Sequence, residues 1–222
     1  MLGDCPDSVG VWVPARCIMK IVYILIVFAA CSVTASAAEP THPKLQKELL
    51  TAEKEDQAIR KQLFSKGAKN LDQDVAMRMK SLDTKNQIRL KAIIAEYGWP
   101  TCKMVGANGV HAAFIILQHA NRDPAFQKSM LPALKKSYAA GDIKGNSIAL
   151  LTDRILVGEG KPQLYGTQAN IINGEAISNE IEQPKNLDKR RAELGLCPHA
   201  EYKEMMSRFY QLSTGKEKAG TK

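Results

Sequence analysis

The segment from residue 104 to 120 constrains the fold most, because it is apolar around nearly its whole circumference. On a helical wheel at about 100° per residue, its polar side chains fall within one narrow arc, and none carries a formal charge. These side chains are Asn108, His111, Gln118 and His119. A helix of this kind needs partners on most of its sides. The polar arc is open to two interpretations, a strip that faces solvent or the lining of a polar site.

Apolar side chains at helical spacing predict further helices on both sides of this segment. The helices are expected at residues 42–64, 74–97, 105–120, 124–140 and 147–157, with two shorter ones within 187–211. Asn173-Gly174 lies between two short arms and predicts a β-hairpin. Two strands alone are marginally stable, so the hairpin is expected to pack on the helices. We therefore predict a mainly α (α+β) fold, a compact multi-helix domain with one β-hairpin in its C-terminal half.

Residues 19–37 have the pattern of a secretory signal. Lys20 precedes an apolar run over 21–30, and small residues follow up to Ala37. The run is shorter than the roughly 20 apolar residues that span a bilayer, so no transmembrane segment is expected in the mature form. The predicted organisation is a leader over 1–37 with an over-extended start before Met19, a single mostly helical domain over 38–213, and a disordered basic tail over 214–222.

Two routes of export stay open. Cleavage after Ala37 would give a periplasmic or secreted protein, which is the route we favour. Lipid attachment at Cys31, in a stretch "FAAC" similar to the bacterial lipobox, would anchor the chain in the envelope. In either case Cys102 and Cys197 are the two cysteines of the folded part, and they form either a disulfide or two unpaired thiols.

The net charge of +8 comes from lysines and arginines that alternate with acids along the helical segments. This pattern is typical of solvated helix faces, and no motif of a nucleic-acid-binding domain accompanies it. His111 and His119 are eight residues apart, whereas a metal-binding H-E-x-x-H helix needs four. We therefore predict no nucleic-acid partner, no metal and no cofactor.

Asp153 and Arg154 fall among apolar residues of the expected helix 147–157. Neighbouring residues on a helix point about 100° apart, so these two cannot pair with each other. Because burial of an unpaired charge costs several kcal/mol, each should find a partner elsewhere in the chain. The candidate partners are Asp83, His119, Asp123, Arg190 and Arg191. Such a network either fixes the helices to one another or lines a pocket.

The glycine-rich stretch "GEGKPQLYGTQ" follows this helix and offers amide and hydroxyl groups on a loop, where recognition is common. The candidate ligand-pocket residues are Gln118, Asp123, Gln163, Tyr165, Gln168 and Arg190. The catalytic candidates are His119, Asp153 and Arg154.

Four stretches, "YGWPT", "LQHANRDPAFQ", "LTDRILVGEGKPQLYGTQ" and "DKRRAELGL", together resemble a bacterial family known as domain of unknown function 6624. The resemblance covers residues 83–202 and implies a set of recurring polar positions. These positions are Asp83, Asn86, Gln118, His119, Asp123, Gln127, Asp153, Arg154, Gln163, Gln168, Arg190 and Arg191. The chain departs from the family at Phe114, where tryptophan is usual, and at Cys197, where proline is common. The second departure implies that a bridge to Cys102 would be particular to exported members.

Two functions fit these residues. The favoured one is a binding or interaction module of the cell envelope, whose polar pocket takes a small polar ligand or an envelope protein. The alternative is a hydrolase-like enzyme in which His119 is the general acid or base, Asp153 or Asp123 orients it, and Arg154 holds an anionic substrate group. The enzyme ranks second because no nucleophile motif such as G-x-S-x-G is present.

Overall fold

The computed structural model describes residues 39–64, 72–172 and 175–214. In these ranges the chain has seven α-helices, one 3₁₀ turn and one two-stranded hairpin. The elements are α1 (Pro43–Phe64), α2 (Gln73–Tyr97), α3 (Cys102–His119), α4 (Pro124–Ala139), α5 (Gly145–Gly158), β1 (Ala169–Ile172), β2 (Glu175–Ser178), η1 (Pro184–Asn186), α6 (Leu187–Glu193) and α7 (His199–Thr214). The prediction of a mainly helical fold with one hairpin in the C-terminal half is confirmed.

Some predictions concern residues outside the described ranges. They include the leader over 1–37 with Cys31, the turn residues Asn173-Gly174, and residues 215–222 of the expected tail. Thr214, which the prediction assigned to the tail, is the last residue of α7. The strands β1 and β2 flank the Asn-Gly pair and are antiparallel, with Ala169 opposite Ser178 and Ile172 opposite Glu175.

Polar caps set the ends of the helices that surround the site. Asp72 accepts hydrogen bonds from the backbone N–H groups of Asp74 and Val75 at the start of α2, and Gly98 ends that helix at a φ of 75°. Helix α3 begins three residues before the predicted start, because Thr101 caps it by accepting from the Met104 N–H. The helix is interrupted at Gly106, whose φ of 68° lies in the region that favours glycine.

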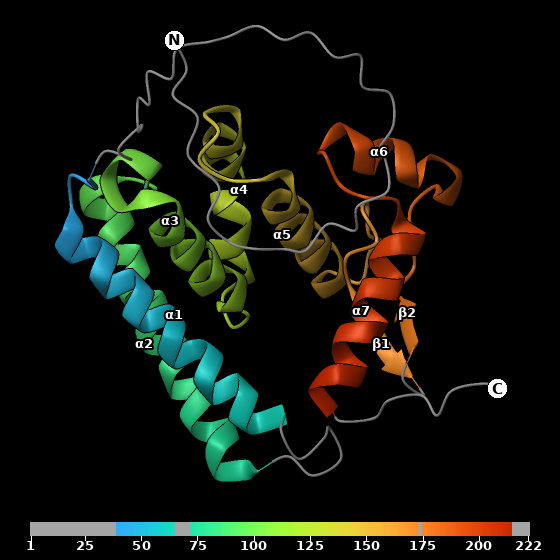
Figure 1. Ribbon diagram of the computed structural model, residues 1–222, viewed down its shortest axis with the longest axis horizontal. Coiled ribbons are helices and arrows are strands. Elements are labelled where there is room, and N and C mark those ends of the chain that lie inside the picture. The colour runs from blue at the N-terminus through green and yellow to red at the C-terminus, as the bar shows by residue number, and fades with distance from the viewer. Residues whose placement is uncertain (1–38, 65–71, 173–174, 215–222) are drawn as a thin grey trace, which may run out of the picture.

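Helix α3 packs against both α1 and α2, as its apolar surface predicts. Figure 1 shows these three helices on one side of the molecule, α4 and α5 in the middle, and the hairpin with α6 and α7 on the other side. The polar arc of α3 is divided. Asn108 and His111 are exposed, whereas Gln118 and His119 are partly buried at the end that approaches α5. The interpretation of a strip that faces solvent therefore holds for the first half of the arc only, because the second half is partly covered by protein.

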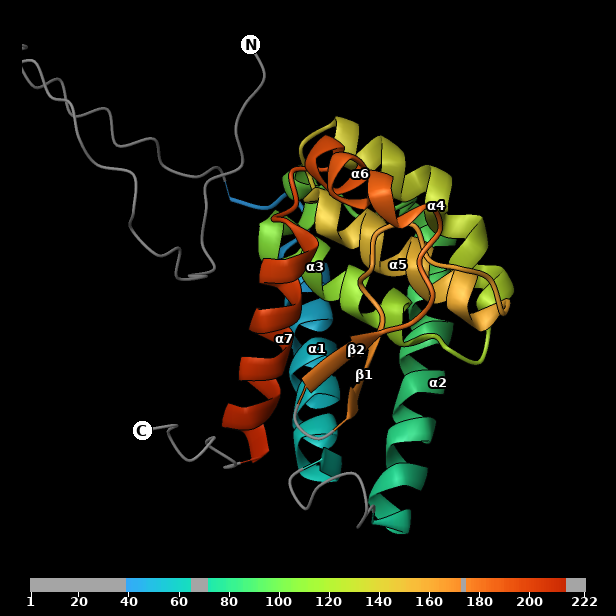
Figure 2. The ribbon, with the colours of Figure 1, turned by 90° about the vertical axis from the view of Figure 1, so that its right-hand side faces the viewer.

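The C-terminal elements pack on one another, and the end of α6 also contacts the start of α5. Helix α7 packs on β2, where the Ala176 N–H donates to the Ser207 hydroxyl, and this contact supplies the support that a lone hairpin needs (Figure 2). At the start of α5, Gly145 lies directly against the backbone of Leu194, the residue that follows α6. None of the helices in the described ranges is long and apolar enough to cross a membrane.

The close approach at Gly145 gives a first testable prediction. A Cβ added at this residue would lie 2.1 Å from the Leu194 carbonyl oxygen, so Gly145→Ala must displace one backbone from the other. We expect a loss of about 1–3 kcal/mol in the free energy of unfolding, measured by urea denaturation. Gly158→Ala is the control, because a Cβ at this other end of α5 meets nothing within 4 Å. Equal effects of the two changes would contradict the prediction.

Candidate functional site

Asp153 lies at the centre of α5 with none of its surface exposed. Its Oδ1 accepts from the backbone N–H groups of Leu164 at 2.8 Å and Tyr165 at 3.0 Å, and its Oδ2 accepts from the N–H of Thr167 at 2.8 Å and the Thr167 hydroxyl at 2.9 Å. The burial of Asp153 is as predicted, but the expected charged partner is wrong. Backbone N–H groups and the Thr167 hydroxyl stabilise the carboxylate by hydrogen bonds instead, and His119 is not among its partners.

Three of the predicted pocket residues, Gln163, Gln168 and Arg190, form hydrogen bonds within the loop 163–168 or to it. The Gln163 side chain is fully buried and bonds to Gln168 N at 2.9 Å, Gln168 O at 3.0 Å and Asn179 O at 2.9 Å. Arg190 Nε donates to the Leu164 carbonyl at 2.8 Å, and Arg191 donates to the Tyr165 carbonyl. The Gln168 amide donates to the Thr167 hydroxyl at 3.2 Å. The residues 163–168 therefore form a rigid loop fixed on α5 and α6.

Asp123 also has a structural role, because it connects two helices. It caps α4 by accepting from the Phe126 N–H at 2.9 Å, and its other oxygen accepts from Gln87 at 2.9 Å and Lys91 at 2.6 Å on α2. The hydrogen bond from Lys91, together with that from the Phe126 N–H, holds the pKa of Asp123 below its usual range. Asp123 thus joins α4 to α2 and is not a partner of His119.

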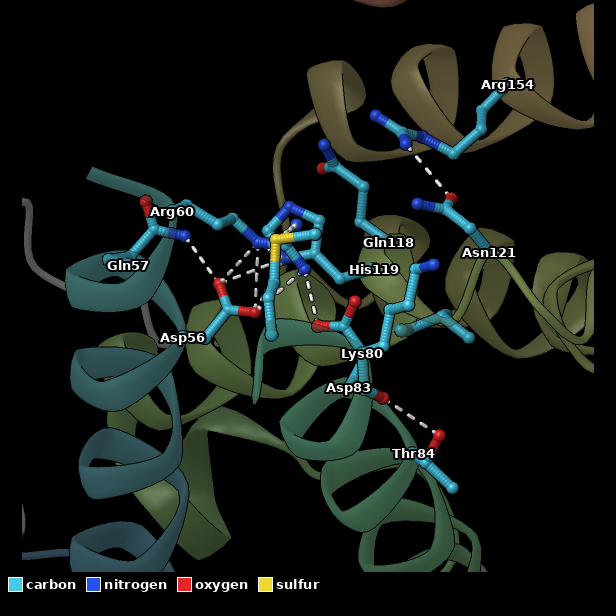
Figure 3. Close-up of polar contacts among 12 residues, drawn as sticks. Asp56, Gln57, Arg60, Lys80, Asp83, Thr84, Gln118, His119, Asn121 and Arg154 are labelled. Carbon is cyan, nitrogen blue, oxygen red and sulfur yellow. Dashed lines mark hydrogen bonds and ion pairs between the residues drawn. The ribbon is translucent and has the colours of Figure 1, made fainter. Parts of the chain in front are cut away.

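A cluster of four ionisable side chains lies where α1, α2 and the end of α3 meet (Figure 3). This acid–histidine cluster comprises Asp56, Arg60, Asp83 and His119. His119 Nδ1 lies 2.9 Å from Asp56 Oδ2, and Arg60 Nη2 lies 3.1 Å from Asp56 Oδ1. The same arginine nitrogen donates to Asp83 Oδ1 at 2.6 Å. Asp56 is 1% exposed and the His119 side chain 13% exposed.

The pKa values of the two carboxyls in the cluster are shifted in opposite directions. Burial opposes ionisation of Asp56, but the hydrogen bonds and charges of His119 and Arg60 outweigh it, and the pKa of Asp56 is lowered. Burial raises the pKa of Asp83, and the attraction of Arg60 offsets this only in part. Asp56 is therefore the firmly ionised carboxylate of the pair.

An ionised Asp56 determines the tautomer of His119. Arg60 Nε lies 3.0 Å from His119 Nδ1 and 3.1 Å from Asp56 Oδ1. An ionised carboxylate can only accept, so the 2.9 Å contact between Nδ1 and Asp56 Oδ2 is a hydrogen bond when Nδ1 carries the proton. In this tautomer the Arg60 Nε–H donates to Asp56 and not to Nδ1. The lone pair of a neutral His119 is then on Nε2, for which the described residues provide no hydrogen-bond partner. This arrangement can accept or release a proton at Nε2.

Asp56 and Arg60 were missed in the sequence, although a signal for Asp56 is present. Asp56 lies seven residues after Leu49 and seven before Leu63, both of which are buried on α1. Two turns of helix return nearly to the same face, so Asp56 is a carboxylate within an apolar stripe. Asp83 has the equivalent position on α2, seven residues before the buried Leu90. A charge at such a position indicates a buried polar contact.

Arg154 extends from α5 toward this region without a carboxylate to pair with. Its Nη1 donates to Asn121 Oδ1 at 3.1 Å, its Nε is buried with no hydrogen-bond partner, and no ion pair joins it to any described residue. Burial lowers the pKa of Arg154, and the positive charge of Arg60 lowers it further. The Gln118 Oε1 atom is also buried without a partner, and in Figure 3 this side chain points toward Arg154.

Cys102 and Cys197, the two cysteines within the described ranges, are not joined by a disulfide. Cys102 Sγ lies 3.6 Å from the Asp142 carbonyl at the start of α3, whereas Cys197 Sγ lies 3.9 Å from Arg191 Nη2 beyond α6. A bridge needs the sulfur atoms at about 2 Å, and each thiol is held by a different part of the fold.

The described residues contain no group of three or more His, Cys, Asp and Glu arranged to hold a metal ion. In the acid–histidine cluster the Arg60 guanidinium bonds to both carboxylates, so a cation already lies between them.

Neither the curated proteins nor the solved structures gave a match. The model of one protein family matches residues 43–215, a range that includes α1 and α2 and therefore the whole acid–histidine cluster. The chain belongs to this family, which is described as a family of unknown function (DUF6624).

Proposed function

We propose that the chain is a binding protein for a small polar anion, held by Arg154 beside His119. The observation that carries this proposal is a half-buried arginine whose Nε is buried without a hydrogen-bond partner and which has no carboxylate to pair with. An unpaired buried charge costs several kcal/mol, and a ligand that supplies the missing anion recovers that cost. A carboxylate or a phosphate suits the site, because each can accept two parallel hydrogen bonds from one guanidinium.

The neighbouring side chains define the rest of the ligand. Gln118 Oε1 needs a hydrogen-bond donor, so the ligand should carry a hydroxyl or an amino group as well as its anion. His119 Nε2 adds one more polar contact next to them. Hydroxy acids, amino acids and sugar phosphates combine these groups. The favoured function is therefore recognition of a small polar metabolite rather than of an extended protein surface.

We place this binding activity in the cell envelope. Support comes from residues 19–37, whose charged start, apolar run and small-residue end have the pattern of an export signal. The mature protein is then periplasmic or secreted, or lipid-anchored through Cys31. Mass spectrometry of the protein from its native host distinguishes these forms, and a chain that retains residues 19–37 would contradict export.

The binding proposal is tested by removal of the Arg154 charge. Ligands are first sought by thermal shift among carboxylates and phosphates that carry hydroxyl or amino groups, and their affinities are then measured by calorimetry. Arg154→Met should weaken binding about 10- to 100-fold, as expected for loss of a charge-assisted hydrogen-bond pair. The melting temperature should be unchanged or higher, because the variant no longer buries an unpaired charge.

The matched control is Arg208→Met, which removes an arginine that pairs with Glu204 on the exposed side of α7. This variant should bind the ligand as the unaltered protein does. If Arg154→Met instead unfolds the protein more readily and keeps full affinity, Arg154 is a structural residue and the binding proposal is wrong.

The acid–histidine cluster favours a second candidate, a hydrolase-like enzyme. Asp56 has the orienting role first assigned to Asp153 or Asp123, because it fixes His119 with Nε2 free to accept a proton. His119 would take the proton of a water molecule while the water oxygen attacks the substrate and Arg154 neutralises the charge that develops. His119→Gln separates the two candidates. An enzyme loses turnover at nearly constant affinity, whereas a binding protein has no turnover to lose.

A further inference from the structure

A cavity of about 410 Å³ lies between α1 and α2, next to Ile116 near the end of α3. The buried part of its lining is mainly aliphatic and includes Leu49, Leu90, Ile93 and Ile116, whereas the residues at its rim are mostly charged. Neither Arg154 nor His119 lines it. Its volume is in the range of about 300–1,000 Å³ that small-molecule sites occupy. We propose that this cavity, the α1–α2 groove, binds a small amphipathic carboxylate, with an aliphatic tail on its walls and a carboxylate at Asn86.

Asn86 is the polar anchor of this proposal. It lines the groove and is only 7% exposed, yet its Nδ2 is buried without a hydrogen-bond partner. A buried donor left unsatisfied costs about 1–3 kcal/mol. Asn86 lies four residues before Leu90 and seven before Ile93, at a position of α2 where an apolar side chain would pack without this cost. An oxygen acceptor from a ligand would satisfy the amide.

The charges at the rim select an anion. Glu48 is held by Arg89, whose Nη2 donates to it at 2.9 Å, so this pair contributes no net charge. The remaining rim charges are three lysines and one carboxylate, namely Lys44, Lys47, Lys85 and Glu55. All three lysines are exposed and can reach over the opening. A positive rim above apolar walls suits a negative head group on an apolar tail, and it disfavours an amine.

The groove and the acid–histidine cluster are adjacent but separate sites. Asn86 lies about one turn of α2 beyond Asp83, and Ala52 of the groove lies about one turn of α1 before Asp56. None of the side chains proposed to bind the anion, Arg154, Gln118 and His119, lines the groove. A substitution in the groove therefore leaves the anion site unchanged, and the reverse also holds.

The test uses the full chain with octanoate as the probe. Two comparison compounds separate its parts: 1-octanol keeps the tail without the carboxylate, and acetate keeps the carboxylate without the tail. Binding is measured by calorimetry and by shifts of the methyl signals of Leu49, Leu90 and Ile93 in NMR spectra. Octanoate should bind at least tenfold more tightly than either comparison compound. Asn86→Leu should weaken octanoate binding at least tenfold, and Lys47→Glu, an exposed change that leaves the fold intact, at least threefold.

The controls are Thr84→Val, an exposed position of α2 that does not line the groove, and Arg154→Met. Both should keep full affinity for octanoate, and retention in Arg154→Met separates this proposal from the anion site. The proposal is overturned if octanoate does not bind, if 1-octanol binds as tightly, or if Asn86→Leu and Lys47→Glu both retain full affinity.

Discussion

Asp153→Ala is expected to lower the free energy of unfolding by about 3–5 kcal/mol, the largest loss for any single change considered. The carboxylate has no exposed surface and accepts from three backbone N–H groups and one hydroxyl of the loop 163–168. Alanine leaves these donors buried and unsatisfied, and each costs about 1–3 kcal/mol unless the loop opens to water. Asp153→Asn should lose about 2–3 kcal/mol, because an amide presents a donor where the loop offers only donors.

Urea denaturation measures these losses, and hydrogen exchange locates them. The amides of Leu164, Tyr165 and Thr167 should lose protection before those of α3. Asp188→Ala is the control, since this exposed carboxylate accepts a single backbone hydrogen bond, from the His199 N–H at 2.8 Å. Its loss should stay below about 1 kcal/mol. A loss at Asp153 no larger than that of the control would show that the loop does not depend on the carboxylate.

Asp56→Ala should have the second largest effect, about 2–4 kcal/mol of unfolding free energy. Removal of the carboxylate leaves Arg60 with Asp83 as its only carboxylate among the described residues and removes the acceptor for the His119 Nδ1 proton. The estimate is below the full cost of a broken buried ion pair, because Asp83 still neutralises Arg60 in part. Urea denaturation at pH 7 measures it.

The control is a comparison of how the stabilities of Asp56→Asn and Asp83→Asn depend on pH. The pKa of Asp56 is lowered on folding, so its stabilisation is present above the unfolded value of about 3.9 and is lost as the pH falls through the folded value. The pKa of Asp83 is raised, so its contribution has the opposite sign and is lost as the pH rises through the folded value. The stability advantage of the unaltered protein over Asp56→Asn should shrink from pH 7 to pH 3, while its stability relative to Asp83→Asn should grow. Parallel curves for the two variants would contradict this assignment.

Periodicity predicts the fold because it reflects which side of each helix is buried. The apolar stripes of α1 to α5 and the Asn-Gly pair between β1 and β2 are features of the local sequence, and the elements lie within a few residues of their predicted ends. Thr101 shows the limit. Its capping bond extends α3 by a turn that the apolar pattern does not contain.

The partners in the candidate site were harder to predict, for two physical reasons. Asp153 is stabilised by hydrogen bonds from backbone N–H groups, which every residue except proline provides and no sequence pattern distinguishes. The partners of His119 lie on α1, about sixty residues earlier in the chain, and their proximity results from helix packing. A charged residue on an apolar stripe indicates that a buried polar contact exists, but it does not identify the partner residue.

The acid–histidine cluster unites groups from three helices, and one of them, α1, precedes the others by a segment outside the described residues. The geometry around the imidazole thus depends on how firmly the first helix is docked. Any ligand that requires this geometry is thermodynamically linked to the docking, and it holds the N-terminal helix in place in proportion to its own occupancy. Protease resistance of α1 would then serve as a readout of whether the protein has found its ligand.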